Sequence, residues 1–378
     1  MSVIAFCLLT YAPGEPAGIE RSVAALMEGC RRLGHQPLVL TATIPGHPAK
    51  SPDIIPLRSL VLPRPIMGKH IREALDHPAP VVTELHRILR EREVEVVCWI
   101  DALWGLGYLG AAPDDVRSVL MVHKIRKDDL FEDAIAAADL VCPISDYLLR
   151  EATAAGLDTR TWRLIPNALL SPVRPVPAPE RELLRRRAPV RIVSRAEPYK
   201  GLAELLQALP DTWTRPVEIV LAEAGFEYWQ GMQSDVIEAC QRAARARPEV
   251  VRLLPAMPWR AVPGFLAGAC ATVISSYEPE TFCNTAAEAL SVGTPVAGFS
   301  LGNLPYLIGA AGPLVPLQQG YRALWDQLAH FLEDPHRYHA AARVAPERVR
   351  NLRPEQAVAT LLAHGQEAPN AAVRTHTR

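Results

Sequence analysis

Residues 280–295, which read ETFCNTAAEALSVGTP, form the most informative stretch of this 378-residue chain. The apolar run TVISS at residues 272–276 predicts a buried strand, and Asn284–Ser291 predicts a short helix. Gly293 and Pro295 end that helix, because glycine and proline are common just beyond helix C-termini. In open α/β sheets, ligands bind beyond the carboxyl ends of the strands. Glu280 is therefore expected at a ligand-binding edge.

Glu288 lies inside the predicted helix among alanine and leucine side chains. A buried carboxylate is unfavourable unless it is paired. Two adjacent hydroxyls of a ligand, such as a ribose diol, would satisfy both of its oxygens. A nearby arginine or backbone group would do so as well, so this residue by itself leaves both interpretations open.

Strands and helices alternate along both halves of the chain, and this alternation predicts parallel sheets covered by helices on both faces. The fold class is therefore α/β, with two Rossmann-like domains, and the turn after the first strand contains Gly18. The proline-rich residues 43–70 are expected to be irregular. Strands are expected at residues 3–9, 38–42, 94–100, 116–122, 139–144, 190–194, 217–222, 250–254, 272–276 and 295–299.

A proline-rich, basic segment divides the two halves. Residues 171–189 hold five prolines and the run Arg185–Arg187, which is expected to be a solvated face of an interdomain linker. The first domain is then residues 1–170 and the second residues 190–345, followed by a C-terminal helix at 346–365 and a disordered tail at 366–378.

The overall composition excludes several classes of protein. A net charge of −1 gives no global field to attract nucleic acid. The seven cysteines are scattered singly, which is typical of free thiols in a reducing compartment such as the cytoplasm. No apolar run approaches the roughly 18 residues of a membrane span. We expect no stable membrane association and a monomer or homodimer.

Two cations follow the first strand of the second half, in SRAEPYKG at residues 194–201. Arg195 and Lys200 suit a diphosphate, one as a fork of donors and the other as a point charge. Amides at the helix start near Asn284 can add donors to the same anion. Together with Glu280 and Glu288 from another strand end, these cations predict a site for a nucleotide-linked sugar.

These motifs resemble those of GT-B glycosyltransferases of family 4, the glycosyl transferases group 1 type. The most specific element is Glu-x7-Glu leading into EALSVGTPV at residues 288–296. Ser194-Arg195 and Lys200-Gly201 match a Gly-Arg…Lys-Gly motif in which Ser194 replaces glycine. AGIER at residues 17–21 resembles Gly-Gly-x-Glu-Arg, and Ile165-Pro166-Asn167 also matches. The resemblance covers nearly the whole chain.

The resemblance implies an enzyme, a hexosyltransferase that moves a sugar from a UDP or GDP sugar with retention of anomeric configuration. It implies two domains facing a cleft and a C-terminal helix packing back toward the first domain. Arg195 and Lys200 would bind the diphosphate, and Glu288 the ribose hydroxyls. Glu280 and His123 would contact the transferred sugar, so His123, Glu280, Arg195 and Lys200 form the expected catalytic set. A lone histidine at a strand end is otherwise often structural.

Further donor contacts are expected from the backbone. Gly18 would let the first turn approach the phosphate, and the amides of Phe282, Cys283 and Asn284 would approach the phosphate or sugar. The base is placed near Met257. No Asp-x-Asp occurs in the sequence, so we expect no metal and no cofactor.

The acceptor is expected in the first domain, at Glu15, Trp99, Asp101, Tyr108 and Lys124. Asp101 could serve as a general base or merely cap a helix, and the aromatic residues could equally belong to the core. The 35 arginines against five lysines suggest a GC-rich genome, which fits a small, soluble natural-product acceptor of aminoglycoside or lincosamide type. A sugar or sugar phosphate is equally open.

Three other functions remain for such a chain. A sugar-nucleotide epimerase would alter the donor without an acceptor. A phosphorylase would need a pyridoxal-binding lysine, and the second half offers only Lys200. A non-catalytic sugar-nucleotide-binding protein would not need all four donor-site charges. Donor turnover against a panel of acceptors separates these functions.

Overall fold

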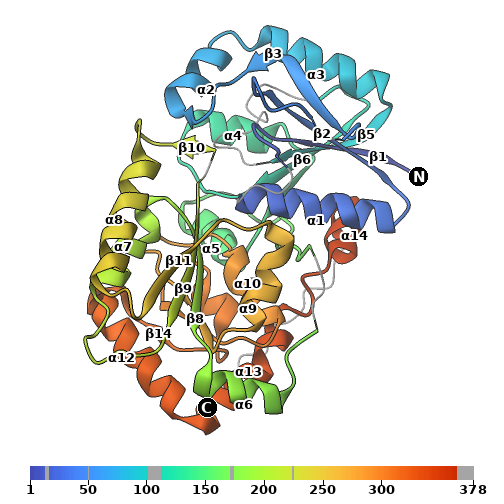
Figure 1. The fold of residues 1–378 in the computed structure, drawn as a ribbon. Helices are drawn as coiled ribbons and strands as arrows, with labels where there is room; N and C mark the ends of the chain where they lie inside the picture. The colour runs from blue at the N-terminus through green and yellow to red at the C-terminus, as the bar shows by residue number, and fades with distance from the viewer. Residues whose placement is uncertain (13–16, 50, 101–111, 171–173, 224, 364–378) are drawn as a thin grey trace.

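The computed structural model describes residues 1–12, 17–49, 51–100, 112–170, 174–223 and 225–363. Two six-stranded sheets, each parallel throughout, lie one above the other in Figure 1, with helices around both. The tail at 366–378 falls outside the described residues. The expected α/β fold with two Rossmann-like sheets is confirmed.

The first sheet has the strand order β3-β2-β1-β5-β6-β7. Its strands are nearly continuous apolar runs, as parallel strands covered on both faces require. The strands are β1 (Val3–Cys7), β2 (Gln36–Thr43), β3 (Ile54–Val61), β5 (Val94–Ile100), β6 (Arg117–Val122) and β7 (Leu140–Pro143). The helices are α1 (Gly18–Arg32), α2 (Gly68–Leu75), α3 (Ala79–Glu91), α4 (Asp129–Ala136) and α5 (Asp146–Ala154).

The second sheet has the order β11-β9-β8-β12-β13-β14. Its strands are β8 (Val190–Arg195), β9 (Val217–Ala222), β11 (Val251–Leu254), β12 (Ala271–Ile274), β13 (Val296–Phe299) and β14 (Leu314–Val315). The helices are α7 (Leu202–Gln207), α8 (Met232–Ala246), α9 (Val262–Ala267), α10 (Asn284–Ser291), α11 (Leu304–Ile308), α12 (Gly320–Glu333) and α13 (Pro335–Val349).

The expectation that residues 43–70 are irregular is wrong. They contain β3, the short strand β4 (Ile66–Met67) and the start of α2. Pro56 lies within β3, which forms the edge of the first sheet. A proline cannot donate to a sheet ladder, and an edge strand tolerates this because one of its sides has no partner strand.

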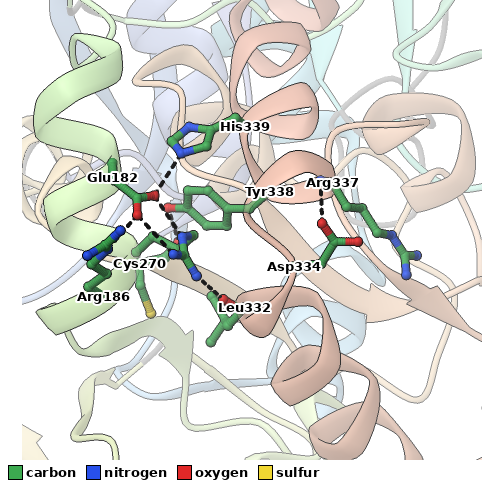
Figure 2. Close-up of polar contacts among 9 residues, drawn as sticks. Glu182, Arg186, Cys270, Leu332, Asp334, Arg337, Tyr338 and His339 are labelled. Atoms are coloured by element: carbon green, nitrogen blue, oxygen red, sulfur yellow. Dashed lines mark hydrogen bonds and ion pairs between the residues drawn. The ribbon is translucent and has the colours of Figure 1, made fainter.

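The segment between the halves is also more ordered than its prolines indicate, because it contains helix α6 (Ala178–Arg187). Figure 2 shows Glu182 of α6 bonded to Arg186 and to His339 of α13. Arg185 donates to Glu182 and to the carbonyl of Leu332. Its side chain is only 12% exposed, so the basic run is not simply a solvated face.

One apolar cluster of side chains runs through both halves. It continues from α1 to α10 and to the last helix, α14 (Pro354–Leu362), which packs on α1. A Cβ on Gly29 of α1 would lie 2.4 Å from the carbonyl oxygen of Pro354, so glycine permits this close approach. The expected return of a C-terminal helix to the first domain is confirmed, although α13 extends to Val349 before α14 begins.

The two halves also share a pair of short parallel strands. The strand β10 (Phe226–Glu227) of the second half pairs with β4 of the first half, and Figure 1 shows β10 away from α1 and α14. The amide of Ile66 donates to the carbonyl of Gly225 at 2.8 Å. The halves therefore touch at this strand pair as well as around α1 and α14.

Among the described helices, none has the length and apolar character needed to cross a bilayer. In the same residues, the seven cysteines are free thiols, and six of them are buried.

Candidate active site

A cavity of about 620 Å³ lies between the two halves. It is lined by the first-turn loop at Gly18, by the ends of strands in both sheets and by the start of α10. Both halves contribute polar side chains, among them His123, Asn167, Arg195, Lys200 and Glu280. A hollow of this volume suits a ligand of the size of a nucleotide sugar.

Lys200 and Glu280 form an ion pair in this cavity, with Nζ 2.6 Å from Oε1. Lys200 follows β8 and Glu280 follows the neighbouring strand β12, so the strand ends bring them together. Ser276 also donates to Glu280. Burial disfavours the ionised carboxylate, but Lys200, Ser276 and Arg195 together hold the pKa of Glu280 below its usual range.

The position of Lys200 depends on the glycine that follows it. Gly201 has φ +59°, and a Cβ there would lie 2.7 Å from the carbonyl oxygen of Ser275 and still closer to the hydroxyl of Tyr321. Ser275 in turn donates to the carbonyl of Lys200. The Lys-Gly pair therefore docks the loop after β8 onto the end of β12.

Arg195 lies at the end of β8 in a network that the motifs did not predict. Its Nη2 lies 2.8 Å from Oε2 of Glu197 and 2.9 Å from the hydroxyl of Tyr199. That hydroxyl donates to Glu197 at 2.6 Å. In the sequence, the only sign of this contact was a carboxylate two residues after the arginine. Glu197 is buried, so it directs the guanidinium and balances its charge.

The loop before α10 approaches the first half of the protein. Asn284 begins α10, and its side-chain amide donates to the carbonyl of Gly18 at 2.8 Å. Asn167 donates to Asn284 at 3.3 Å. Cys283 has φ +74°, a left-handed conformation that a residue other than glycine rarely adopts. Phe282 and Cys283 also line the cavity.

Glu288 is bonded to an arginine that the sequence interpretation did not place in the site. Nη1 of Arg21 donates to both carboxylate oxygens at 2.8 Å. Arg21 belongs to α1, so the contact joins the two halves. Burial raises the pKa of Glu288, and Arg21 opposes that rise. Of the two alternatives for Glu288, the structure contains the arginine partner.

His123 follows β6 and lines the cavity from the first half. Burial lowers the pKa of its imidazole from 6.5 to about 4. The ring is therefore neutral at pH 7 and adds no positive charge to the cavity. Met257 and Lys124 also line it.

Of the five expected acceptor residues, the structure describes Trp99 and Lys124. Trp99 does not line the cavity: it is buried in the core of the first half, and its indole donates to the hydroxyl of Ser118 at 2.9 Å. Its assignment to an acceptor site was wrong, because an aromatic side chain near a strand end packs equally well inside. Glu15, Asp101 and Tyr108 lie outside the described residues.

Within the part of the chain that the structure describes, no three histidine, cysteine, aspartate or glutamate side chains are grouped to hold a metal ion.

Two family models match the sequence. The model described as Glycosyl transferases group 1 matches residues 185–348, and the model described as Glycosyltransferase Family 4 matches residues 16–169. Residues 170–184, which include most of α6, separate the two matches, and together the matches cover most of the chain. A comparison with curated proteins found no match.

The chain is also similar to solved structures. Sucrose-phosphate synthase from Thermosynechococcus elongatus has a TM-score of 0.77 at 19% identity, covering 96% of this chain and 97% of that one. Anabaena Alr3699/HepE in complex with UDP-glucose has a TM-score of 0.69 at 18% identity, covering 96% and 99%. AviGT4, a glycosyltransferase involved in avilamycin A biosynthesis, has a TM-score of 0.53 at 19% identity, covering 93% and 97%.

Proposed function

Because the chain belongs to the family 4 glycosyltransferases with the GT-B fold, we propose that it transfers a hexose from a nucleoside diphosphate sugar to a small, water-soluble acceptor with retention of anomeric configuration. The carrying observation is the cavity between the halves, where Arg195 and Lys200 stand beside Glu280. The similar Anabaena protein was solved with UDP-glucose. UDP and GDP sugars are the donors to test first.

The donor diphosphate binds at Arg195 and Lys200. Breaking the bond between sugar and phosphate develops negative charge on the leaving nucleotide, and fixed cations stabilise it. Backbone amides at the start of α10 and the turn at Gly18 approach the same anion, since helix N-termini favour negative charge. These groups supply the positive charge without a metal ion.

The reacting sugar lies between Glu280 and His123. Its ring becomes positively charged as the bond breaks, and a nearby carboxylate stabilises that charge. A neutral imidazole can hydrogen-bond to a hydroxyl of the sugar without opposing the charge. The ion pair with Lys200 holds the Glu280 carboxylate ionised and in place.

The nucleoside extends toward Met257 and Glu288. Glu288 accepts the ribose hydroxyls, and the base lies by Met257, which lines the cavity. Phe282, Cys283 and Asn284 present their backbone between the nucleoside and the sugar. This arrangement places the nucleoside on the side of α9 and α10, where the two halves pack through α1.

The acceptor enters from the first half, with Lys124 in the cavity wall. Residues 66–77 combine apolar and basic side chains, as a membrane-binding helix does. In the structure Ile66 and Ile71 are buried, so its apolar residues are used inside the protein. The similarity to AviGT4 supports a natural-product acceptor.

The proposed function is tested by incubating the chain with UDP and GDP sugars and a panel of small acceptors. Nucleotide release together with a glycosylated product supports transfer, and proton NMR of the product gives its anomeric configuration. An altered donor sugar without acceptor indicates an epimerase. Nucleotide binding with no turnover of any donor indicates a non-catalytic protein.

A further inference from the structure

Arg21 uses only part of its binding capacity in the pair with Glu288. A guanidinium usually binds a carboxylate through two nitrogens. Here Nη1 alone donates to both oxygens, and Nε is buried without a hydrogen-bond partner among the described residues. Both side chains are largely buried, at 13% and 11% exposure. A buried donor without a partner is unfavourable, so a better acceptor should attract this side chain.

Arg21 also stands between Glu288 and the main cavity. It lines that cavity and a small hollow beside it, whereas Glu288 lines only the small hollow. Asn284, one turn earlier on α10, does line the main cavity. A nucleoside that reaches Asn284 therefore meets Arg21 before it meets Glu288.

We propose that Arg21 is a further donor-binding residue: the ribose hydroxyls replace it at Glu288, and the released guanidinium binds the diphosphate. This exchange rests on the proposed function. Two adjacent hydroxyls can donate to the two oxygens of Glu288, and the guanidinium fork matches phosphate oxygens. Arg21 lines the same cavity as Arg195 and Lys200, so it becomes a third cation for the diphosphate.

The exchange links recognition of the ribose to the two halves of the protein. Glu288 belongs to the second half and Arg21 to the first, so ribose binding in one half frees a cation from the other. A 2′-deoxynucleotide offers Glu288 only one of the two hydroxyls and displaces Arg21 less well. A ribonucleotide therefore gains affinity over a 2′-deoxynucleotide at Glu288 and again through Arg21 at the diphosphate.

A purely structural pair predicts different behaviour. If Arg21 only held Glu288 in place, removing Arg21 would weaken binding of a nucleoside and of its diphosphate by the same factor. If Arg21 is exchanged, removing it frees Glu288 for the ribose and costs affinity only when a diphosphate is present.

Calorimetry separates the two cases. UDP, GDP and ADP are titrated into the wild type, and the tightest of them is compared with its own nucleoside. We expect Arg21→Met to lower the affinity for the diphosphate by about tenfold or more, which is the usual loss for a charge-assisted hydrogen bond. We expect the nucleoside to bind as well as before or more tightly. Arg32→Met is the matched control, because Arg32 is an exposed residue of the same helix.

A double variant covers the case in which Glu288, left unpaired, destabilises the fold. Adding Arg21→Met to Glu288→Gln removes both charges. The double variant should bind the diphosphate about tenfold more weakly than Glu288→Gln alone. No loss in that background, or equal losses for nucleoside and diphosphate in the single variant, overturns the exchange. If the wild type binds none of the three diphosphates, the proposed function fails as well.

Discussion

Acidification should unfold this protein partly through His123. The pKa of the folded imidazole is about 4, against 6.5 for an exposed histidine. As the pH falls below 6.5, the His123 imidazole becomes protonated in the unfolded chain, whereas in the folded chain it stays neutral until about pH 4. The stabilising contribution is therefore complete above pH 6.5 and is lost between 6.5 and 4. The shift corresponds to about 3 kcal/mol in total, of which about 2 kcal/mol is lost by pH 5.

The test combines NMR with denaturation. The resonances of histidine rings are followed from pH 7.5 to 4.5, and that of His123 is identified by its absence in His123→Gln. It should stay in the neutral form to about pH 5. Wild type should lose about 2 kcal/mol more stability than His123→Gln between pH 7 and 5. His77→Gln, at an exposed side chain, is the control. A His123 ring that titrates near pH 6.5 would refute the reasoning.

Four further outcomes are expected. Arg195→Met and Lys200→Met should each lower kcat by about a hundredfold or more, and near-normal turnover would contradict their diphosphate roles. Activity should survive EDTA, since cations of the protein face the diphosphate; loss on chelation with rescue by Mn²⁺ would contradict this. Arg181→Met should lower stability by about 3 kcal/mol, because the buried guanidinium donates to the carbonyls of Ala267, Ala269 and Val292, whereas exposed Arg186→Met should change little in urea denaturation. The chain should not co-sediment with anionic vesicles, and salt-sensitive co-sedimentation would indicate a lipid-linked acceptor.

Contacts between neighbouring strand ends could be predicted from the sequence. The apolar runs located β8 and β12, and the carboxyl ends of parallel strands meet at one edge. That reasoning was sufficient to bring Lys200 and Glu280 together. The helix pattern separately located Asn284 at the start of α10.

Contacts between the halves could not be predicted in this way. Arg21 and Glu288 are 267 residues apart, and their meeting depends on how α1 packs against α10. Periodicity describes each helix separately and says nothing of that packing. Trp99 shows the same limit, because an aromatic side chain at a strand end can face a ligand or the core. The helix α6 was missed because prolines dominate the segment around it.

The packing of α14 on α1 has a consequence for dividing the gene. A cut between residues 170 and 178 would leave the first fragment without α14, which covers part of α1 and comes from the other end of the chain. The first fragment produced alone would expose that apolar surface and tend to aggregate. Produced together, the two fragments can reassemble, because α14 of the second fragment can pack on α1 of the first. The chain is therefore a natural candidate for split-protein complementation, with assembly of the fragments reported by recovered activity.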